Sequence, residues 1–265
     1  MSPSPSTDAL IGSLKGGLIV SCQARIGSPM RSTSTIVALA QSAELGGAVG
    51  VRIDGATDIA AVSRQVSVPI IGIHKVDVDD VALITPHLKV LPTLVDAGAS
   101  VVAIELTRRA YPDQRVYAEV LSQVQQDWAH RGFALMADIS TLDEGTAALE
   151  CGVDLLGTTL AGFTSYSQSR VLPDLDLVER LAKEGARVIA EGGYGRPEEA
   201  HEAIKRGAWS VCVGAAITDP IAITREFARA LPRADGSRSP IRKASPAQPF
   251  GARDGAEPSR STGNQ

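Results

Sequence analysis

Lys75 is the residue whose chemical type and position best fit proton transfer, because it closely follows the apolar run at residues 70–73. A lysine ammonium that loses part of its hydration at the end of a buried strand has a lowered pKa and can act as acid or base near neutral pH. Two other interpretations stay open. The ammonium could simply form an ion pair with Asp138 or Glu191, or the amine could attack a ketone to form a Schiff base.

Polar residues or a glycine-rich turn follow eight apolar runs in succession, and Lys75 is one of these residues. In a barrel of parallel strands the chemistry takes place at the carboxyl ends of the strands, so these residues would converge on one site. One such residue alone is more often a cap or a solvated side chain, but eight in succession favour a functional site. In chain order they are Ser21 and Gln23, Arg52, Lys75, Glu105 and Thr107, Asp138, Thr158 and Thr159, Glu191, and the turn Gly214-Ala215-Ala216.

Two glycine-rich turns, one after each of the last two apolar runs, could hold a phosphate group. Helix N-terminal amides and aligned peptide dipoles favour an anion, and barrels often bind phosphate after their last two strands. A glycine-rich turn is often no more than a turn, but two neighbouring ones at this place indicate anion binding. We therefore expect a phosphate site formed by Gly192, Gly193, Gly214 and Ala215.

The eight apolar runs predict an α/β protein, a single-domain (β/α)₈ TIM barrel. Their apolarity is continuous rather than alternating, which suits parallel strands covered on both faces. Helix-length segments separate the runs; residues 34–45, for example, carry apolar residues at helical spacing and end at Gly46-Gly47. An open doubly wound sheet would alternate in the same way, but no GxGxxG motif follows the first run. The runs span residues 18–20, 48–51, 70–73, 101–104, 133–136, 154–157, 188–190 and 211–213.

Composition and charge indicate how the chain is divided and which classes of partner it lacks. In this chain of 265 residues we expect an N-terminal segment over 1–13, a barrel over 14–232, and a disordered tail over 233–265 that has hardly any large apolar side chain. The net charge of -4 provides no basic surface for nucleic acid, and no segment is apolar enough for a membrane span. We expect a cytoplasmic protein, and the sequence is compatible with a homodimer.

The cysteines and histidines indicate neither disulfides nor a metal site. The three cysteines form no CxxC pair, so we expect reduced thiols. His74 should point away from the barrel interior if Lys75 points into it, because neighbours on a strand face opposite sides. The other histidines show no metal-ligand spacing. The three cysteines are Cys22, Cys151 and Cys212, and the other histidines are His87, His130 and His201.

Several segments at the predicted strand ends match a known family in the same order along the chain. They span residues 14–24, 47–53, 69–73 with Lys75, 136–141, 157–160 with Gly162 and Tyr166, 189–192, and 213–214 with 216–218. Together they resemble the N-acetylmannosamine-6-phosphate 2-epimerase family of bacterial sialic-acid catabolism. The resemblance covers about residues 14–230, and the combination of segments is highly specific.

This resemblance implies a (β/α)₈ barrel that interconverts N-acetylmannosamine 6-phosphate and N-acetylglucosamine 6-phosphate without a cofactor, by moving the proton on C2. Matched position by position, it implies that Lys75 and Glu191 transfer the proton. The turns after the last two strands would hold the 6-phosphate. The residues that would contact the sugar, its acetamido group or the catalytic lysine are Gln23, Arg52, Asp138 and Thr159.

Two positions near the expected phosphate depart from the family's pattern. Gly193 and Asp219 stand where the family usually has arginine. The loss of a charge-assisted hydrogen bond weakens anion binding by about 1–3 kcal/mol, so Arg108, Arg109, Arg196 or backbone amides would have to compensate. A related phosphosugar aldolase or isomerase, and a sugar-phosphate-binding protein without catalysis, stay open as alternatives.

Overall fold

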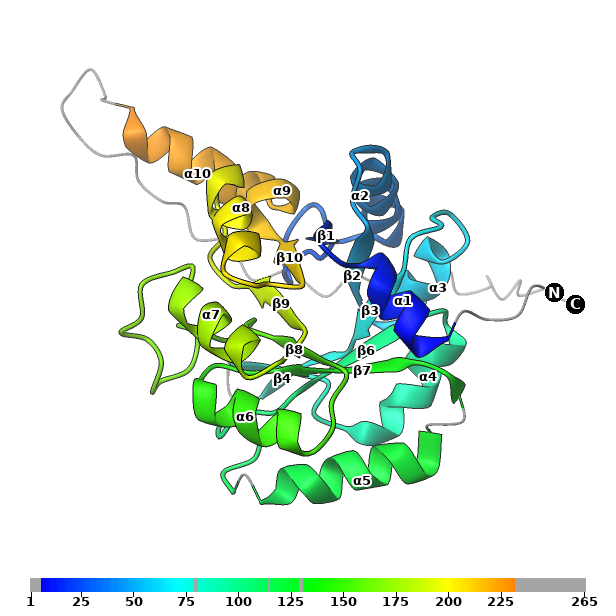
Figure 1. The fold of residues 1–265 in the computed structure, drawn as a ribbon. Coiled ribbons are helices and arrows are strands. Elements are labelled where there is room, and N and C mark those ends of the chain that lie inside the picture. Colours follow the sequence, from blue (N-terminus) through cyan, green and yellow to red (C-terminus); the bar gives the residue numbers. More distant parts are fainter. Residues whose placement is uncertain (1–5, 79–80, 114, 129–130, 232–265) are drawn as a thin grey trace, which may run out of the picture.

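Eight parallel strands form a closed barrel in the computed structural model, as the sequence predicted (Figure 1). The structure describes residues 6–78, 81–113, 115–128 and 131–231, so the disordered tail predicted over 233–265 lies outside the described residues. Around the barrel the strands follow the order β1-β10-β9-β8-β7-β6-β3-β2. They are β1 (Leu18–Ser21), β2 (Gly50–Asp54), β3 (Ile70–Ile73), β6 (Val101–Glu105), β7 (Ala134–Asp138), β8 (Leu155–Gly157), β9 (Val188–Glu191) and β10 (Ser210–Val213).

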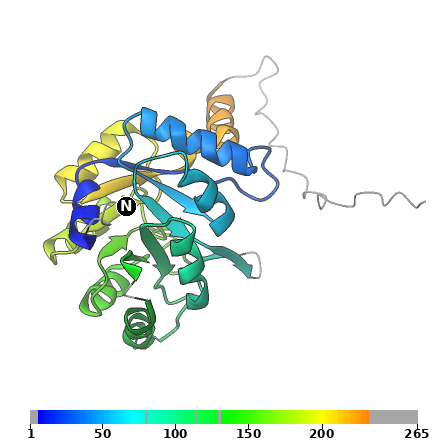
Figure 2. The same ribbon diagram turned by 90° about the vertical axis from the view of Figure 1, so that its right-hand side faces the viewer.

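Helices surround these strands (Figure 2). The helix predicted over residues 34–45 is α2, which begins at Thr33 because the Ser32 hydroxyl caps it by accepting a hydrogen bond from the Thr35 amide. Within the described residues, no helix is both long and apolar enough to cross a lipid bilayer. The helices are α1 (Thr7–Ser13), α2 (Thr33–Leu45), α3 (Ala56–Val62), η1 (Leu88–Val90), α4 (Leu91–Asp96), α5 (Val116–Trp128), α6 (Leu142–Glu150), α7 (Leu175–Lys183), α8 (Pro197–Lys205), α9 (Ala215–Thr218) and α10 (Pro220–Ala230).

The continuous apolarity of the strands reflects two apolar layers, one on each face of the barrel wall. Ile19, Met136 and Ile189 belong to the layer that fills the barrel interior. Their strand neighbours, such as Val20 and Val188, belong to the outer layer that packs against the helices. Because successive strand residues face opposite sides, both faces must be apolar for the strands to be buried.

Helix α1 packs against the amino ends of the strands, opposite the end where the chemistry was predicted. Leu10 and Ile11 join the interior layer together with Leu14, which follows the helix. The Trp209 indole Nε1 donates a hydrogen bond to the Ile11 carbonyl at 2.9 Å. Part of the predicted N-terminal segment thus packs directly onto the barrel.

A two-stranded antiparallel hairpin, which the sequence analysis did not predict, follows β3. It consists of β4 (Lys75–Val78) and β5 (Val81–Ile84), and residues 79–80 between them lie outside the described residues. The Thr85 amide donates to the His74 carbonyl at 2.8 Å, and the Thr85 hydroxyl accepts from the His74 amide at 3.0 Å. These bonds close the base of the hairpin. Lys75 therefore begins β4 instead of ending the third barrel strand.

Two glycines that follow helices test how closely the ends of neighbouring helices are packed. Gly47 and Gly98 both have positive φ, at 92° and 114°. A Cβ on Gly47 would meet no atom within 4 Å, whereas a Cβ on Gly98 would lie 2.6 Å from the Ser63 Cβ. Gly98 is therefore required both by its backbone conformation and by the close approach of Ser63.

We expect Gly98→Ala to destabilise the fold more than its matched control Gly47→Ala. Both variants bear the cost of a left-handed backbone, about 1–2 kcal/mol. Gly98→Ala also forces an overlap with Ser63, which adds about 1–3 kcal/mol. Urea denaturation followed by circular dichroism would measure both free energies of unfolding. Equal losses in the two variants would contradict the packing argument.

Candidate active site

A pocket of about 720 Å³ opens at the carboxyl ends of the barrel strands. It includes both residues expected to move protons, Lys75 and Glu191. Lys75 follows β3 and Glu191 ends β9, and these two strands lie on opposite sides of the ring. Other predicted site residues also line the pocket, so the structure brings most of the predicted set together. These are Gln23, Arg52, Thr159, Gly214 and Ala215.

Arg52, from β2, forms the floor of the pocket and is almost completely buried. Its Nη1 and Nη2 donate to the two carboxylate oxygens of Asp138 at 3.1 and 2.6 Å, and Nη1 also donates to Glu191 Oε2 at 2.9 Å. Burial alone would lower the pKa of Arg52, but the charges of Asp138 and Glu191 outweigh it and raise the pKa above its usual range. Arg52 therefore stays charged and holds two carboxylates from different strands.

Glu191, the last residue of β9, presents a largely buried carboxylate whose side chain is 14% exposed. Its Oε2 also accepts a hydrogen bond from the Thr159 hydroxyl at 3.1 Å. The Thr158 hydroxyl fixes the adjacent backbone, because it accepts from the Glu191 amide and donates to the Glu191 carbonyl. Burial raises the pKa of Glu191 above its usual range, although the charge of Arg52 opposes this shift. The carboxylate is thus held in place and is a stronger base than an exposed glutamate.

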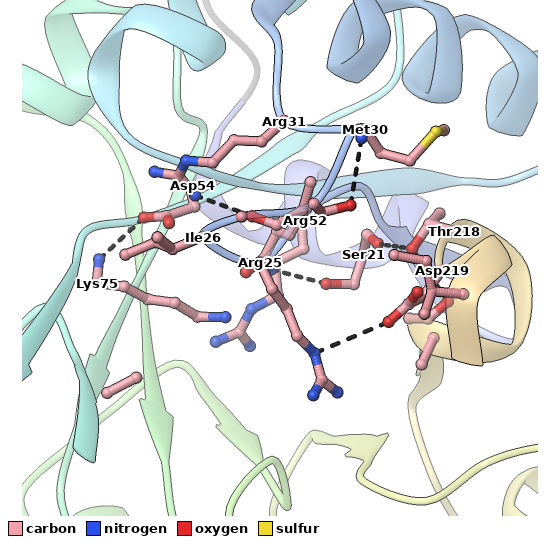
Figure 3. Close-up of a pocket in the computed structure, with 18 of the residues that line it drawn as sticks. Ser21, Arg25, Ile26, Met30, Arg31, Arg52, Asp54, Lys75, Thr218 and Asp219 are labelled. Carbon is pink, nitrogen blue, oxygen red and sulfur yellow. Dashed lines mark hydrogen bonds and ion pairs between the residues drawn. The ribbon is translucent and has the colours of Figure 1, made fainter. Parts of the chain in front are cut away.

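Lys75 reaches the same pocket from the hairpin. Its amide donates to Asp54 Oδ1 at 2.9 Å, which anchors the start of β4 beside the end of β2. Figure 3 shows the Lys75 side chain extending over the pocket toward Arg52. The residue remains exposed, but the pocket walls remove part of the hydration of the ammonium and Arg52 repels it, and both effects lower the pKa of Lys75.

A buried carboxylate, Glu105, holds the hairpin that carries Lys75. Its Oε2 accepts from the amide of Ile84, the residue paired with Lys75 across the hairpin, at 3.0 Å. Arg109 completes the connection, because its Nε donates to Glu105 Oε1 at 2.6 Å and its Nη2 donates to the Ala82 carbonyl at 3.0 Å. The sequence analysis noted Glu105 as a polar strand end, but its role could not be found without the hairpin.

Asp138 lies beneath Arg52 and is fully buried, so the structure places it under the pocket floor. Its Oδ1 also accepts from the Thr159 hydroxyl at 2.6 Å. Gln23 does reach the pocket, where its Nε2 donates to the Ser21 hydroxyl at 2.7 Å. Asp138 is therefore placed to orient Arg52, whereas Gln23 and Thr159 can meet a ligand.

The two expected phosphate turns differ in position. Gly214 and Ala215 line the pocket. Gly193 instead faces Leu172, because a Cβ on Gly193 would lie 2.6 Å from the Leu172 Cβ, and Gly192 faces the carbonyls of residues 158 and 159. The structure thus brings only the turn after β10 to the pocket wall.

The arginines expected to compensate for Gly193 and Asp219 do not line the pocket. Arg109 is engaged by Glu105, Arg108 stacks over the Tyr166 ring at 4.9 Å, and Arg196 pairs with Glu199 at 2.7 Å. Neighbouring acidic or aromatic residues hold these three side chains elsewhere, so of the groups considered for compensation only the backbone amides of the turn at Gly214 and Ala215 lie at the pocket. The pocket contains other arginines that the sequence analysis missed, and the signal was their place in connections directly after strand ends or in the last helix. They are Arg25, Arg31 and Arg225.

Among the described residues, no group of three or more His, Cys, Asp or Glu side chains is arranged to hold a metal ion. Cys22 and Cys212 are buried free thiols, and Cys151 is a free thiol with intermediate exposure. Burial raises the pKa of Cys22 to about 12 and that of Cys212 well above its usual value. These two cysteines are therefore neutral parts of the apolar layers.

We expect Glu105→Gln to loosen the hairpin selectively. The amide side chain has lost the charge that attracts Arg109, and its nitrogen cannot accept a hydrogen bond from the Ile84 amide. Hydrogen–deuterium exchange should become at least about tenfold faster at residues 75–78 and 81–84, and stay unchanged in the barrel strands. Thr107→Val is the matched control, since it removes another donor to Glu105 at 2.6 Å but leaves the hairpin contacts in place. Equal acceleration in both variants would contradict this role of Glu105.

The chain is similar to a known protein family over most of its length. The family model described as "Putative N-acetylmannosamine-6-phosphate epimerase" matches residues 36–233. A protein of Caldanaerobacter subterraneus named "Putative N-acetylmannosamine-6-phosphate 2-epimerase" is 42% identical over 220 residues, which are 82% of this chain and 92% of that protein. A protein of the same name from Cutibacterium acnes is 42% identical over 85% of this chain and 98% of its own length.

A solved structure agrees with these sequence relatives. The N-acetylmannosamine-6-phosphate 2-epimerase from Clostridium perfringens superposes with a TM-score of 0.77 and 34% sequence identity, over 87% of this chain and all of that one. The fold and the extent of the matches agree with the resemblance found in the sequence. This chain belongs to the N-acetylmannosamine-6-phosphate epimerase family.

Proposed function

We propose that the protein is an epimerase that interconverts N-acetylmannosamine 6-phosphate and N-acetylglucosamine 6-phosphate with its own side chains and no cofactor. The observation that carries the proposal is that Lys75 and Glu191 line one pocket of a member of this family. In the ring of strands, β3 and β9 are four positions apart. A proton donor and a proton acceptor can therefore approach one carbon from opposite sides.

The reaction requires such a pair. The hydrogen on C2 of the sugar is acidic only when C1 is an aldehyde, so the sugar ring must open first. One of Lys75 and Glu191 then removes the C2 proton to form an enolate, whose negative charge lies mainly on the C1 oxygen, and the other returns a proton to the opposite face of C2. Arg52, with the Lys75 ammonium when it is charged, can stabilise the negative charge that develops on the C1 oxygen. When Lys75 and Glu191 start in the opposite protonation states, the same steps run in the other direction.

The environment brings the proton affinities of the two groups closer together. The pKa of Lys75 is lowered and that of Glu191 is raised, in both cases mainly by loss of hydration. Proton transfer is most efficient when the catalytic pKa lies near the working pH. The pocket thus favours an ammonium that can give up a proton and a carboxylate that can accept one.

Gln23 provides a contact suited to the acetamido group. Its Oε1 is buried and has no hydrogen-bond partner among the described residues, while its Nε2 is occupied by Ser21. A buried acceptor without a donor is unfavourable, so an N–H or O–H group of the substrate would satisfy it. The N–H of an acetamido group has this character.

We further propose a cytoplasmic location, because a sugar phosphate carries charge and does not cross a lipid bilayer unaided. The partner we expect for this chain is a small amino-sugar phosphate. Whether two copies associate stays a prediction, for which size-exclusion chromatography with light scattering is the direct measurement.

In D₂O the wild-type protein should place deuterium at C2 of the product from N-acetylmannosamine 6-phosphate. Lys75→Ala and Glu191→Gln should each slow this exchange at least about 100-fold, since each removes one proton carrier. Proton NMR measures the loss of the C2 signal. Lys183→Ala is the control, because Lys183 lies on α7 and pairs with Glu179 there.

The same assay separates the other functions. A Schiff-base aldolase would be trapped by borohydride through Lys75, and a binding protein would show no exchange at all. Persistence of full exchange in both the Lys75 and the Glu191 variants would rule out their assignment as proton carriers.

The pH dependence of kcat/KM should be bell-shaped, and Thr159→Val should shift its acid limb to higher pH. Activity falls on the acid side as Glu191 gains a proton and on the alkaline side as Lys75 loses one. The Thr159 hydroxyl stabilises the ionised Glu191 and so lowers its pKa. Without this hydrogen bond the pKa of Glu191 rises further. Steady-state rates across the pH range test this, and a shift of the acid limb to lower pH would contradict it.

A further inference from the structure

Three arginines that line the pocket, Arg25, Arg31 and Arg225, have no place in the proposed proton transfer, and Arg25 stands out among them by its position. Arg25 lies in the connection between β1 and α2, and its side chain is 84% exposed. It lines the pocket beside the turn of Gly214 and Ala215. Figure 3 shows the Arg25 side chain beside the ends of Lys75 and Arg52, with a dashed line joining it to Asp219.

The other cations near the pocket floor are already engaged. Arg52 is held by two carboxylates, and Lys75 extends toward the reacting carbon in the proposed mechanism. Arg31, on the same connection as Arg25, donates its Nη1 to the Ala24 carbonyl at 2.9 Å and so shapes the loop. Arg25 is thus the cation of this connection whose guanidinium is directed over the pocket.

The contact that holds Arg25 is weak and easily exchanged. Its Nε lies 3.8 Å from Asp219 Oδ2, which is an ion pair beyond hydrogen-bond distance. Such exposed pairs contribute little to stability. Asp219 itself is fixed, because its Oδ1 caps α10 by accepting from the Ala222 amide at 3.1 Å. The aspartate therefore stays in place while the arginine can turn to another anion.

A sugar phosphate is a better partner for Arg25 than Asp219 is. A phosphate monoester carries about -1.5 to -2 charges at pH 7 and offers three acceptor oxygens. The planar guanidinium can donate two parallel hydrogen bonds to such a group. An incoming phosphate would thus replace one long ion pair by shorter, charge-assisted bonds.

We propose that Arg25 is the specificity-determining residue for the 6-phosphate, and that Asp219 holds it over the pocket and competes with the phosphate for it. This proposal rests on the proposed function for the identity of the substrate. It assigns the phosphate contact to the connection after β1, instead of to the turn after β9 where Gly193 stands. It also gives Arg25 and Asp219 opposite effects on phosphate affinity.

The test compares Arg25→Gln, Asp219→Asn and the control Arg187→Gln in the full-length protein. Asparagine retains the helix cap of Asp219 without its charge. Arg187 is a matched control, because it forms another exposed arginine–aspartate pair, with Asp8 at 3.3 Å, at the amino end of the barrel. Two measurements are made: calorimetric binding of inorganic phosphate, and KM and kcat for N-acetylmannosamine with and without the 6-phosphate.

We expect Arg25→Gln to weaken binding of inorganic phosphate and raise KM for the phosphorylated sugar about 10- to 100-fold, with kcat changed less than about threefold. Its kcat/KM for the unphosphorylated sugar should stay as in the wild type. Asp219→Asn should tighten phosphate binding by up to about fivefold, the range of an exposed ion pair. Arg187→Gln should change neither measurement.

Three outcomes in the variants would overturn the proposal. They are unchanged phosphate affinity in Arg25→Gln, equal losses for both sugars, and weaker phosphate binding in both Arg25→Gln and Asp219→Asn, as a merely structural pair would give. Absence of measurable phosphate binding by the wild type would overturn it as well. If the wild type binds phosphate but epimerises neither sugar, the proposed function fails while the binding data still decide the role of Arg25.

Discussion

The ion pairs of Arg52 with Asp138 and Glu191 are the interaction on which the site depends. A buried guanidinium is tolerated only when its charge is matched, and removal of one partner from such a cluster costs about 3–5 kcal/mol. Here the partners come from β7 and β9, on the side of the ring away from β2. The Thr159 hydroxyl shares its one proton between the two carboxylates, at 2.6 Å from Asp138 Oδ1 and 3.1 Å from Glu191 Oε2. The cluster therefore holds together the carboxyl ends of distant strands and forms a rigid floor for the pocket.

Burial beside this cluster shifts the pKa values of the two residues proposed as acid and base. The charge of Arg52 lowers the pKa of Lys75 and opposes the rise in the pKa of Glu191, while burial acts on both groups in the directions that bring them together. The charge of Glu191 in turn acts on Lys75, whose pKa it raises against the effects of burial and of Arg52. The hairpin fixed by Glu105 then determines how near the ammonium lies to the floor.

The sequence was sufficient to predict the barrel, and most of the predicted site residues do line the pocket, for reasons that are local. Continuous apolar runs mark strands buried on both faces, and the residue after each run must lie at the mouth. Lys75 was placed in the pocket but on the wrong element, because its hairpin is defined by pairing with residues 81–84 and by the buried Glu105. The depth of Asp138 and the contact of Gly193 with Leu172 depend on packing between segments far apart in the chain, which no local pattern records.

The charge balance of the floor also bears on where an anionic substrate can be held. Arg52 and a charged Lys75 are matched by Asp138 and Glu191, and Asp54 adds another carboxylate to the pocket wall. Proton transfer between Lys75 and Glu191 leaves this net charge unchanged. The floor therefore has no surplus positive charge for a phosphate, and in the proposed reaction the charge of Arg52 is needed where the enolate forms. In the proposed function the phosphate is therefore held at the rim, where the turn of Gly214 and Ala215 lines the pocket and the connection after β1 places Arg25.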